Sequence, residues 1–294
     1  MNMRRVLVTG ANKGIGFAIA ERILEEADDT FVYLGCRDVG RGGAAAEELQ
    51  QGGVDRDRRI QVVEIDVAHD ESVDRAAREV RGSCGGDEIY GVVNNAGIGF
   101  GSNDLRTVLN VNTRGVKRVC SALIPLLADS GRIVNITSAA GPNFVATCSL
   151  EKQAFFTNPE VTWSEIEVLM EECLAIAGNA EAFASRGLDN GSPYGLSKAC
   201  ANALTIHLAR ENPQFVINAC TPGFIATDLT LRYLDQSGKR PEEMGMKSPR
   251  EGASSAIFLL FGEPEGSGHY YGSDAKRSPM DRYRAPGSLA YTGD

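Results

Sequence analysis

Several features that would mark a metal-binding or disulfide-stapled protein are missing from this chain. Its 294 residues contain three histidines, one tryptophan and seven cysteines. The cysteines are scattered, odd in number and never arranged as C-x-x-C, so we expect neither a disulfide framework nor a cysteine zinc site. The histidines, His69, His207 and His269, lie far apart and beside no cysteine cluster, so we expect no metal site.

A long hydrophobic run and an excess of positive charge are also missing. No apolar run approaches the roughly 18 residues that span a bilayer. Residues Met1 to Arg5 lead directly into an apolar strand instead of a charged-then-apolar leader. The net charge is −9 and the basic residues are dispersed, which disfavours binding to nucleic acid or an anionic membrane. We therefore expect a cytoplasmic protein that binds neither.

Apolar residues make up 43% of the chain and gather in short runs that alternate with helix-length segments. The runs predict strands at Val6–Val8, Phe31–Cys36, Ile60–Ile65, Gly91–Val93, Arg132–Thr137, Phe215–Ala219 and Tyr270–Tyr271. The predicted helices are Gly16–Glu26, Gly42–Gln50, Glu71–Arg81, Leu105–Ala128, Tyr194–Glu211 and Arg250–Phe261. This alternation predicts an α/β fold with a doubly wound parallel sheet (Rossmann type) of about seven strands and helices on both faces. Ligands bind such sheets beyond the carboxyl ends of the strands.

A long insertion at residues 143–192 breaks the alternation. Within it, Thr162–Ala184 has apolar residues at spacings of three and four, which indicates a helix. A helix packed on its own core is the interpretation we favour, and a helix that covers a subunit-contact surface is the alternative. We expect one catalytic domain over residues 1–276, followed by a polar tail at 277–294 that is irregular or disordered.

The most informative motif is the run Thr9–Gly16, T-G-A-N-K-G-I-G, between an apolar strand and a helix. Gly10 suits a tight turn, Gly14 lets backbone approach the phosphates of a dinucleotide, and Gly16 lets the helix pack closely on the strand. Glycine also ends strands for purely structural reasons, so this motif alone is weak evidence for a dinucleotide site and has to be judged together with the other motifs of the chain.

The end of the second predicted strand bears on the choice of cofactor. A carboxylate there binds the ribose 2′-hydroxyl of NAD, whereas an arginine suits the 2′-phosphate of NADP. Arg37 stands at this point, with Arg41 and Lys13 able to reach the phosphate, and this favours NADP. Asp38 keeps NAD open, because a shift of one residue would bring an acid closer.

Tyr194 and Lys198 lie four residues apart at the start of a predicted helix, and therefore on one face of it. The pKa of a free tyrosine is about 10. A neighbouring ammonium favours the phenolate and lowers this pKa, which would suit Tyr194 to act as a general acid. The same spacing also arises often by chance.

Two further polar residues are catalytic candidates. Ser138 follows the strand Arg132–Thr137, where its hydroxyl could donate to a substrate carbonyl as negative charge develops, or merely close a turn. Asn112 falls within a helix-length segment, where asparagine is locally unfavourable. A polar network and a solvent-facing position would each explain it.

The ends of the fourth and sixth strands carry further candidates for cofactor contact. Asn94-Asn95-Ala96-Gly97 could hold a turn or contact a ribose. Pro222-Gly223 reads first as a turn, and Thr227 follows at a distance that would let it reach a bound carboxamide.

Together these motifs resemble those of the short-chain dehydrogenase/reductase family, in the family's order and over nearly the whole chain. The resemblance implies that Tyr194 protonates a carbonyl oxygen while a nicotinamide delivers hydride to the carbon. It implies that Ser138 positions that oxygen, that Lys198 holds the nicotinamide ribose and lowers the pKa of Tyr194, and that Asn112 supports a water relay to Lys198. Asp66, with Val67 beside it, matches the family's adenine-contacting acid.

A closer resemblance is to the monomeric carbonyl reductases. Residues 9–16 and 36–42 are similar to their cofactor segments, as are the insertion before Tyr194 and the run Gly268-His269-Tyr270-Tyr271. In that group the inserted helix blocks the usual dimer surface, which implies a monomer here. Ala139-Ala140, the segment Phe224–Lys247 and the tail after Lys276 depart from the resemblance, so it implies no particular substrate.

The resulting hypothesis is NADPH-dependent reduction of aldehydes or ketones, with quinones as candidates. One alternative is a narrow-substrate secondary-alcohol dehydrogenase or reductase of a steroid, terpenoid or other secondary metabolite. A more distant one is a non-catalytic NADPH-sensing or interaction protein. The expected cofactor-binding residues are Gly10, Asn12, Lys13, Gly14, Ile15, Gly16, Arg37, Arg41, Asp66, Val67, Asn94, Ala96, Gly97, Tyr194, Lys198, Pro222, Gly223 and Thr227.

Overall fold

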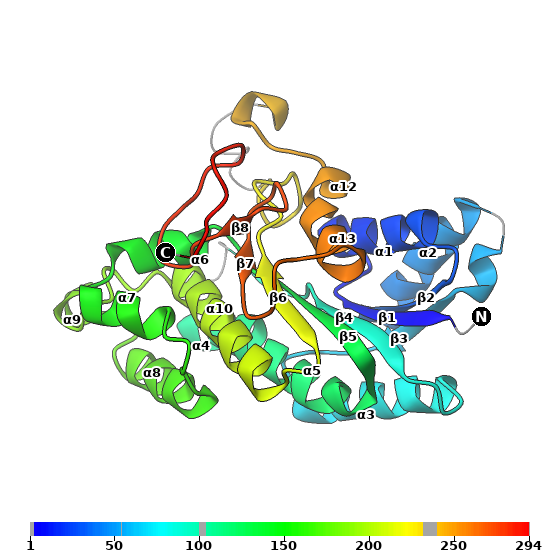
Figure 1. The fold of residues 1–294 in the computed structure, drawn as a ribbon, viewed down its shortest axis with the longest axis horizontal. Coiled ribbons are helices and arrows are strands. Elements are labelled where there is room, and N and C mark those ends of the chain that lie inside the picture. The colour runs from blue at the N-terminus through cyan, green and yellow to red at the C-terminus, as the bar shows by residue number, and fades with distance from the viewer. Residues whose placement is uncertain (1–2, 54, 100–103, 232–239, 294) are drawn as a thin grey trace.

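In the computed structural model, which describes residues 3–53, 55–99, 104–231 and 240–293, eight strands form one sheet (Figure 1). The strand order is β3-β2-β1-β4-β5-β6-β7-β8. Neighbouring strands are parallel except β7 and β8, which are antiparallel. The strands are β1 (Arg4–Thr9), β2 (Thr30–Cys36), β3 (Ile60–Glu64), β4 (Ile89–Asn94), β5 (Leu127–Ile136), β6 (Val216–Cys220), β7 (Tyr270–Tyr271) and β8 (Arg277–Ser278).

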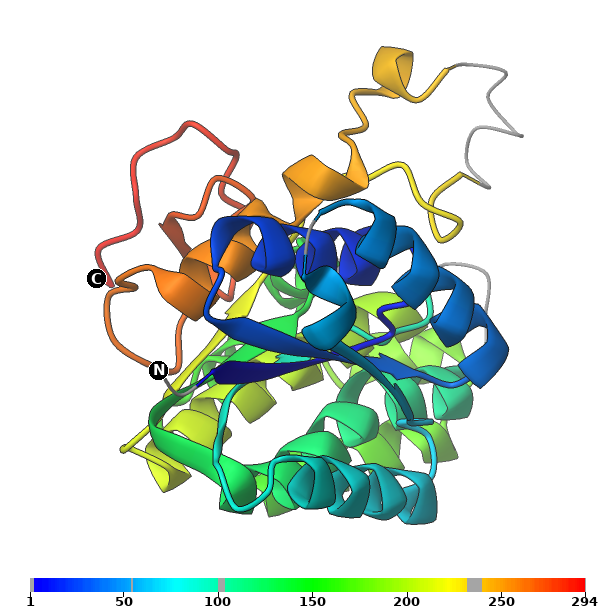
Figure 2. The same ribbon diagram turned by 90° about the vertical axis from the view of Figure 1, so that its right-hand side faces the viewer.

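Helices cover both faces of this sheet (Figure 2). One face carries α1 (Gly14–Glu26), α2 (Val39–Gln51), α12 (Pro249–Gly252) and α13 (Ser254–Phe261). The other carries α3 (Asp70–Ser83), α4 (Leu105–Leu109), α5 (Gly115–Leu123) and α10 (Pro193–Glu211). Side chains of β1 alternate between two cores, since Leu7 belongs to one buried cluster and Val6 and Val8 to the other. A strand buried on both faces must be apolar throughout, and the predicted doubly wound α/β fold is confirmed.

The structure corrects two of the helices predicted outside the insertion. The helix predicted over Leu105–Ala128 is α4, a π-helical turn η2 (Asn110–Arg114), α5 and a 3₁₀ turn η3 (Ile124–Leu126), and β5 already begins at Leu127. Pro125 lies in η3, where its missing amide and fixed ring prevent an α-helix from continuing. The helix predicted over Arg250–Phe261 is divided at Ala253 into α12 and α13. Short 3₁₀ turns also occur at η1 (Arg56–Arg58) and η4 (Glu242–Met244).

The insertion before α10 contains four helices, which group at one side of the molecule in Figure 1. They are α6 (Ala140–Thr147), α7 (Leu150–Phe156), α8 (Trp163–Ala175) and α9 (Ala180–Ser185). The pattern predicted one helix over Thr162–Ala184, and Gly178, with a φ of 83°, separates it into α8 and α9. Thr162 and Glu165 form a capping box at the start of α8, and the buried face of α8 joins the core on the α10 side of the sheet.

Candidate active site

The loop between β1 and α1 needs glycine at three positions. Gly10 and Gly14 have φ values of 66° and 58°, in the left-handed region that favours glycine. A Cβ at Gly16 would lie 2.4 Å from the carbonyl oxygen of Gly10, so any side chain there would push α1 off the loop. Lys13 precedes α1 without a side-chain capping bond, which leaves the first amides of the helix available to a phosphate.

The segment after β4 is hydrogen-bonded to Thr9, at the start of this loop. The hydroxyl oxygen of Thr9 accepts hydrogen bonds from the backbone amides of Asn95 and Ala96, both at 3.0 Å. Asn95 Nδ2 donates to the Thr9 carbonyl oxygen at 2.9 Å. Asn94 is buried and donates to Asn135 Oδ1 at 2.9 Å, so it holds β4 to β5. Asn95, which sequence reasoning left out of the cofactor residues, is therefore the asparagine that shapes the loop.

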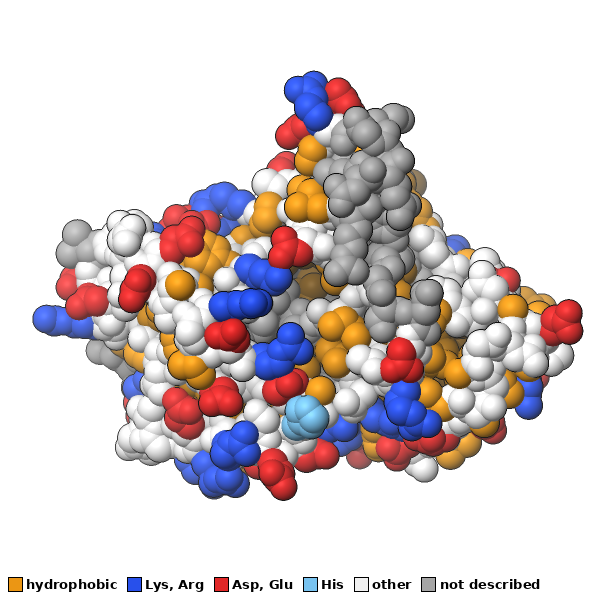
Figure 3. Space-filling view, turned by 180° about the vertical axis from the view of Figure 1, so that it is seen from behind, with side chains coloured by type: hydrophobic (Ala, Val, Ile, Leu, Met, Phe, Trp, Pro, Cys, Tyr) orange, Lys and Arg blue, Asp and Glu red, His pale blue; other side chains and the backbone are white. Residues whose placement is uncertain are grey.

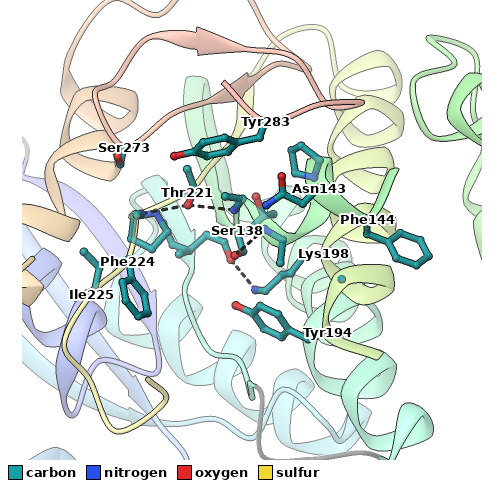
Figure 4. A pocket seen from close by; sticks show the side chains of 18 of the residues that line it. Ser138, Asn143, Phe144, Tyr194, Lys198, Thr221, Phe224, Ile225, Ser273 and Tyr283 are labelled. Carbon is teal, nitrogen blue, oxygen red and sulfur yellow. Dashed lines mark hydrogen bonds between the residues drawn. The ribbon is translucent and has the colours of Figure 1, made fainter. Parts of the chain in front are cut away.

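Ser138, Tyr194 and Lys198 meet beyond the carboxyl end of β5 (Figure 4). Ser138 lies between β5 and α6, and its Oγ accepts a hydrogen bond from the Ala140 amide at 3.1 Å. Tyr194 and Lys198 lie on the first turns of α10 and are almost fully buried. Lys198 Nζ donates to the carbonyl oxygen of Ile136 at 3.0 Å and lies 5.7 Å from the centre of the Tyr194 ring.

Burial dominates the electrostatics of Lys198. Desolvation lowers the pKa of its ammonium to about 8, against a smaller opposing influence of Cys220. A lysine with this pKa still carries its charge at neutral pH, in a site that solvates the charge poorly. Such a cation is stabilised by a negative charge nearby. The side chain of Tyr194, which lies beside Lys198, can supply this charge as a phenolate.

Asn112 lies in the π-helical turn η2 and is fully hydrogen-bonded there. Its Oδ1 accepts from the Ile98 amide at 2.9 Å, and its Nδ2 donates to the Ile98 carbonyl oxygen at 2.9 Å and to Ser197 Oγ at 3.1 Å. Ser197 is the neighbour of Lys198 on α10. A Cβ at Gly97 would lie 3.2 Å from Asn112 Oδ1 and 3.7 Å from Lys198 Nζ, so that glycine keeps space open between them. Asn112 thus connects the loop after β4 to the helix of the catalytic pair.

Ser138, Tyr194 and Lys198 line one cavity of about 710 Å³ at the carboxyl edge of the sheet, and Asn112 lies outside its lining. Figure 4 shows Ser138, Tyr194 and Lys198 together on its inner side. The sequence-predicted residues that line it are Ile15, Gly97, Ser138, Tyr194, Lys198, Pro222, Gly223 and Thr227. Thr227 also packs over the glycine-rich loop, since a Cβ at Gly14 would lie 3.4 Å from its methyl group.

The other predicted cofactor residues lie on the same edge but outside this cavity. Arg37 and Arg41 are exposed after β2. Asp38 caps α2, with Oδ1 accepting from the Arg41 amide at 3.0 Å. Lys13, which follows Asn12 in the loop, forms an ion pair with Asp228.

Asp66 and Val67 follow β3 and are less available than Arg37 or Arg41. Asp66 is half-buried, and its Oδ1 accepts from the Ala68 amide at 3.0 Å. Val67 is buried against Gly115, where a Cβ would lie 3.0 Å from a Val67 methyl carbon.

Sequence reasoning missed most of the outer part of the cavity. These lining residues come from α6, from the loop before α10, from the segment after β6, from β7 and from the C-terminal tail. Among them are Asn143, Phe144, Asp189, Phe224, Met244, Tyr270, Tyr283, Arg284 and Pro286. No motif unites these segments, and only the fold brings them together.

Other kinds of site find little support in the described part of the chain. There, no group of three or more His, Cys, Asp or Glu side chains is arranged to hold a metal ion. No described helix is both long enough and apolar enough to cross a membrane. The seven cysteines are buried free thiols, and burial raises the pKa of Cys36 to about 11. Acidic and basic side chains are interspersed on the face drawn in Figure 3.

Comparisons with a family model and with known proteins agree with one another. A family model described as short chain dehydrogenase matches residues 4–150. Carbonyl reductase (NADPH) 1 of Mus musculus is 32% identical over 276 residues, which cover 89% of this chain and 92% of the mouse protein.

Two solved structures from plants are similar over nearly their whole length. Salutaridine reductase from Papaver somniferum has a TM-score of 0.74 and 25% identity, covering 91% of this chain and 99% of its own. Menthone neomenthol reductase from Mentha piperita has a TM-score of 0.73 and 26% identity, with coverages of 93% and 99%.

Proposed function

Since the chain belongs to the short-chain dehydrogenase/reductase family and is a carbonyl reductase-like enzyme of it, we propose that it reduces aldehydes and ketones to alcohols with NADPH. The observation that carries this proposal is the meeting of Ser138, Tyr194 and Lys198 in one cavity beside the glycine-rich loop. A fold alone does not imply an activity, but an acid, a hydrogen-bond donor and a cation in one pocket suit carbonyl reduction.

The glycine-rich loop fits a dinucleotide. The cradle between Gly10 and Gly16 admits no Cβ, and the helix amides after Lys13 have no side-chain cap. The residues that would hold the cofactor are those named from the sequence other than Asn94, whose buried side chain holds β4 to β5, with Asn95 added because it shapes the loop. NADPH, when bound, supplies the hydride that the carbonyl carbon accepts.

The protein's own residues manage the carbonyl oxygen. Tyr194 donates its phenolic proton to this oxygen, so that hydride and proton together give the alcohol. Ser138 donates a hydrogen bond to the same oxygen while negative charge develops on it. Lys198 stabilises the phenolate that Tyr194 leaves behind. Asn112 orders the chain around Lys198 and supports the water relay that returns a proton to the site.

The charged residues that follow β2 favour NADPH over NADH. Arg37 and Arg41 are exposed cations at this point, suited to a 2′-phosphate. Asp38, the one carboxylate that could replace them, is already engaged as the cap of α2. An engaged carboxylate is less available to a ribose 2′-hydroxyl.

The two plant structures favour a second candidate for the substrate range. Their printed names are those of reductases of salutaridine and of menthone, each a named compound. A narrow-substrate reductase of a secondary metabolite is therefore the alternative to a general carbonyl reductase. A non-catalytic NADPH-sensing protein is disfavoured by the complete set of Ser138, Tyr194 and Lys198.

We also propose that the protein is a monomer. Helix α8 contacts α4 and α10. Glu171 of α8 pairs with Arg114, and the Trp163 ring lies 5.9 Å from Lys117 Nζ. These contacts support the interpretation that α8 covers the outer surface of α5 and α10, which would otherwise be free to meet a second copy.

Consumption of NADPH, followed by its absorbance, tests the proposed activity. The panel is quinones, aromatic aldehydes, α-dicarbonyls and cyclic ketones, with NADH in parallel. Turnover of several classes with NADPH supports a general carbonyl reductase, and turnover of one cyclic ketone supports the narrow-substrate alternative. Tight NADPH binding without any turnover across the panel contradicts the general carbonyl-reductase activity.

A further inference from the structure

We propose that the C-terminal tail is a wall of the substrate pocket, and that Tyr283 on this tail is a specificity-determining residue that favours carbonyl substrates bearing a ring. This inference rests on the proposed function and adds a specificity-determining residue to it. Its starting point is that Tyr283, Arg284 and Pro286 line the same cavity as Ser138 and Tyr194. Figure 4 shows the Tyr283 ring on the opposite side of the pocket from Tyr194 and Lys198.

An ion pair and hydrogen bonds attach the tail to the body of the protein. We call this group of residues, Asp274, Ser278, Arg284, Gly287 and Ser288, the clasp. Arg284 has only 7% of its side chain exposed and forms an ion pair with Asp274. Its Nε donates to Ser278 Oγ at 2.9 Å, and its Nη1 donates to the Ser288 carbonyl oxygen at 2.9 Å. Asp274 Oδ2 accepts from the Gly287 amide at 3.0 Å. A buried ion pair with its other hydrogen bonds satisfied holds a segment in one arrangement, so the predicted irregular tail is an ordered loop.

A second attachment lies further along the tail. Strand β8 pairs with β7, which is next to β6 in the sheet. The Tyr291 amide donates to the Arg277 carbonyl oxygen at 3.1 Å. The guanidinium groups of Arg277 and Arg282 lie 5.6 and 5.4 Å from the centre of the Tyr291 ring. Tyr283 is thus carried between two anchored points rather than on a free end.

Tyr270 lines the same cavity as the tail residues and the catalytic residues. Tyr270 is buried on β7. Burial raises the pKa of Tyr270 well above its usual value, and Cys220, Tyr283 and Tyr194 add to this effect. Tyr194, Tyr270 and Tyr283 all line this one cavity.

Two exposed aromatic rings suit this pocket to a ring-bearing substrate. Tyr283 is 53% exposed and Phe224 is 39% exposed, and both line the cavity. A substrate ring packed against these faces would remove apolar surface from water and gain favourable aromatic geometry. A small acyclic carbonyl compound has no ring face to pack against these two side chains.

The charges around the pocket do not favour an anionic substrate. Among the described lining residues the charged ones are Asp189, Lys198 and Arg284. Arg284 is neutralised by Asp274, and Lys198 is assigned to the reaction. No lining cation remains free in this part of the chain to attract a carboxylate or phosphate on the substrate.

The test compares two substrates across matched tail variants. The ratio of kcat/KM for 2-methyl-1,4-naphthoquinone to that for 2,3-butanedione is measured with NADPH in wild type, Tyr283→Ala, Tyr283→Phe and Leu289→Ala. Leu289 is a control in the same tail, because it is 93% exposed and does not line the cavity. We expect Tyr283→Ala to lower the ratio about tenfold through KM, Tyr283→Phe to restore most of it and Leu289→Ala to leave it unchanged.

The clasp supplies a second variant. Asp274→Asn should lower the same ratio by loosening the loop that carries Tyr283, with the melting temperature of each variant measured alongside. Equal losses for both substrates, or an unchanged ratio in Tyr283→Ala, would overturn the inference.

A binding measurement separates this inference from the proposed function. If wild type turned over neither of these substrates nor any other carbonyl compound of the panel, the proposed function would fail. Calorimetric binding of the naphthoquinone to the NADP⁺-loaded protein would then decide the tail inference. Binding weakened about tenfold in Tyr283→Ala supports it, and absent or unaltered binding overturns it.

Discussion

Lys13 Nζ lies 2.5 Å from Asp228 Oδ2, so an ion pair joins the glycine-rich loop to the loop after β6. The two residues are 215 positions apart in the chain, and both side chains are more than half exposed. Lys13 is also one of the cations expected to reach the cofactor's 2′-phosphate. Asp228 therefore competes with that phosphate for Lys13.

Asp228→Asn should tighten NADPH binding. The substitution frees Lys13 from its carboxylate partner, and exposed pairs of this kind are worth up to about 1 kcal/mol. We expect the Kd for NADPH to fall about two- to fivefold, with little change for NADH, in fluorescence titrations at low salt. A weaker NADPH complex would show instead that the pair is needed to form the binding site.

Arg37→Asp should weaken NADPH far more than NADH. A lost charge-assisted contact to the 2′-phosphate costs about 1.5–3 kcal/mol, or roughly 10- to 100-fold in Kd. Arg58→Asp is the matched control, because Arg58 is exposed and precedes β3, at the amino ends of the strands, whereas Arg37 follows the carboxyl end of β2. Equal losses for the two nucleotides would contradict the assignment of the 2′-phosphate to Arg37.

Lys198→Met should stabilise the folded protein at neutral pH. The pKa of Lys198 falls from 10.5 to about 8 on folding, so between these values the unfolded chain binds more protons. The stability of wild type therefore rises with pH through this window. We expect the variant to be more stable by about 3 kcal/mol at pH 7 in urea unfolding, with the difference narrowing toward pH 10. A difference that did not vary with pH would show that burial does not disfavour the Lys198 charge.

The protein should stay monomeric on concentration. Helix α8 packs on α10 and α4, with the Arg114–Glu171 pair at its edge. Light scattering over a hundredfold range of concentration should give a constant mass near the chain's 31.5 kDa. A stable dimer mass across this range would contradict the covering role of α8.

The sequence predicts most of the sheet because its strands have one physical requirement. A parallel strand covered on both faces must be apolar, and runs such as Val6-Leu7-Val8 meet that condition with no exposed surface. The residues at which helices and strands end are harder to predict from the sequence. The helix predicted to run to Ala128, for example, ends earlier because of Pro125. The family is also predictable, since its motifs are local and occur in a fixed order.

The outer pocket could not be predicted in this way. Tyr283 and Phe224 lie on segments far apart in the chain but line one cavity, and Arg284, the neighbour of Tyr283, forms an ion pair with Asp274. An Arg and an Asp ten positions apart carry no pattern that distinguishes an ion pair from two solvated charges. Asn95 was missed for a related reason, because only the structure shows which of two adjacent asparagines faces the glycine-rich loop.

The most direct test of the account is Tyr194→Phe, assayed for carbonyl reduction and for NADPH binding in the same preparation. Phenylalanine keeps the ring against Lys198 and removes only the hydroxyl that is proposed to donate the proton. We predict a loss of kcat of at least about a hundredfold, with the Kd for NADPH within about twofold of wild type. Near-normal turnover in this variant would contradict the assignment of Tyr194 as the acid, and with it the proposed mechanism.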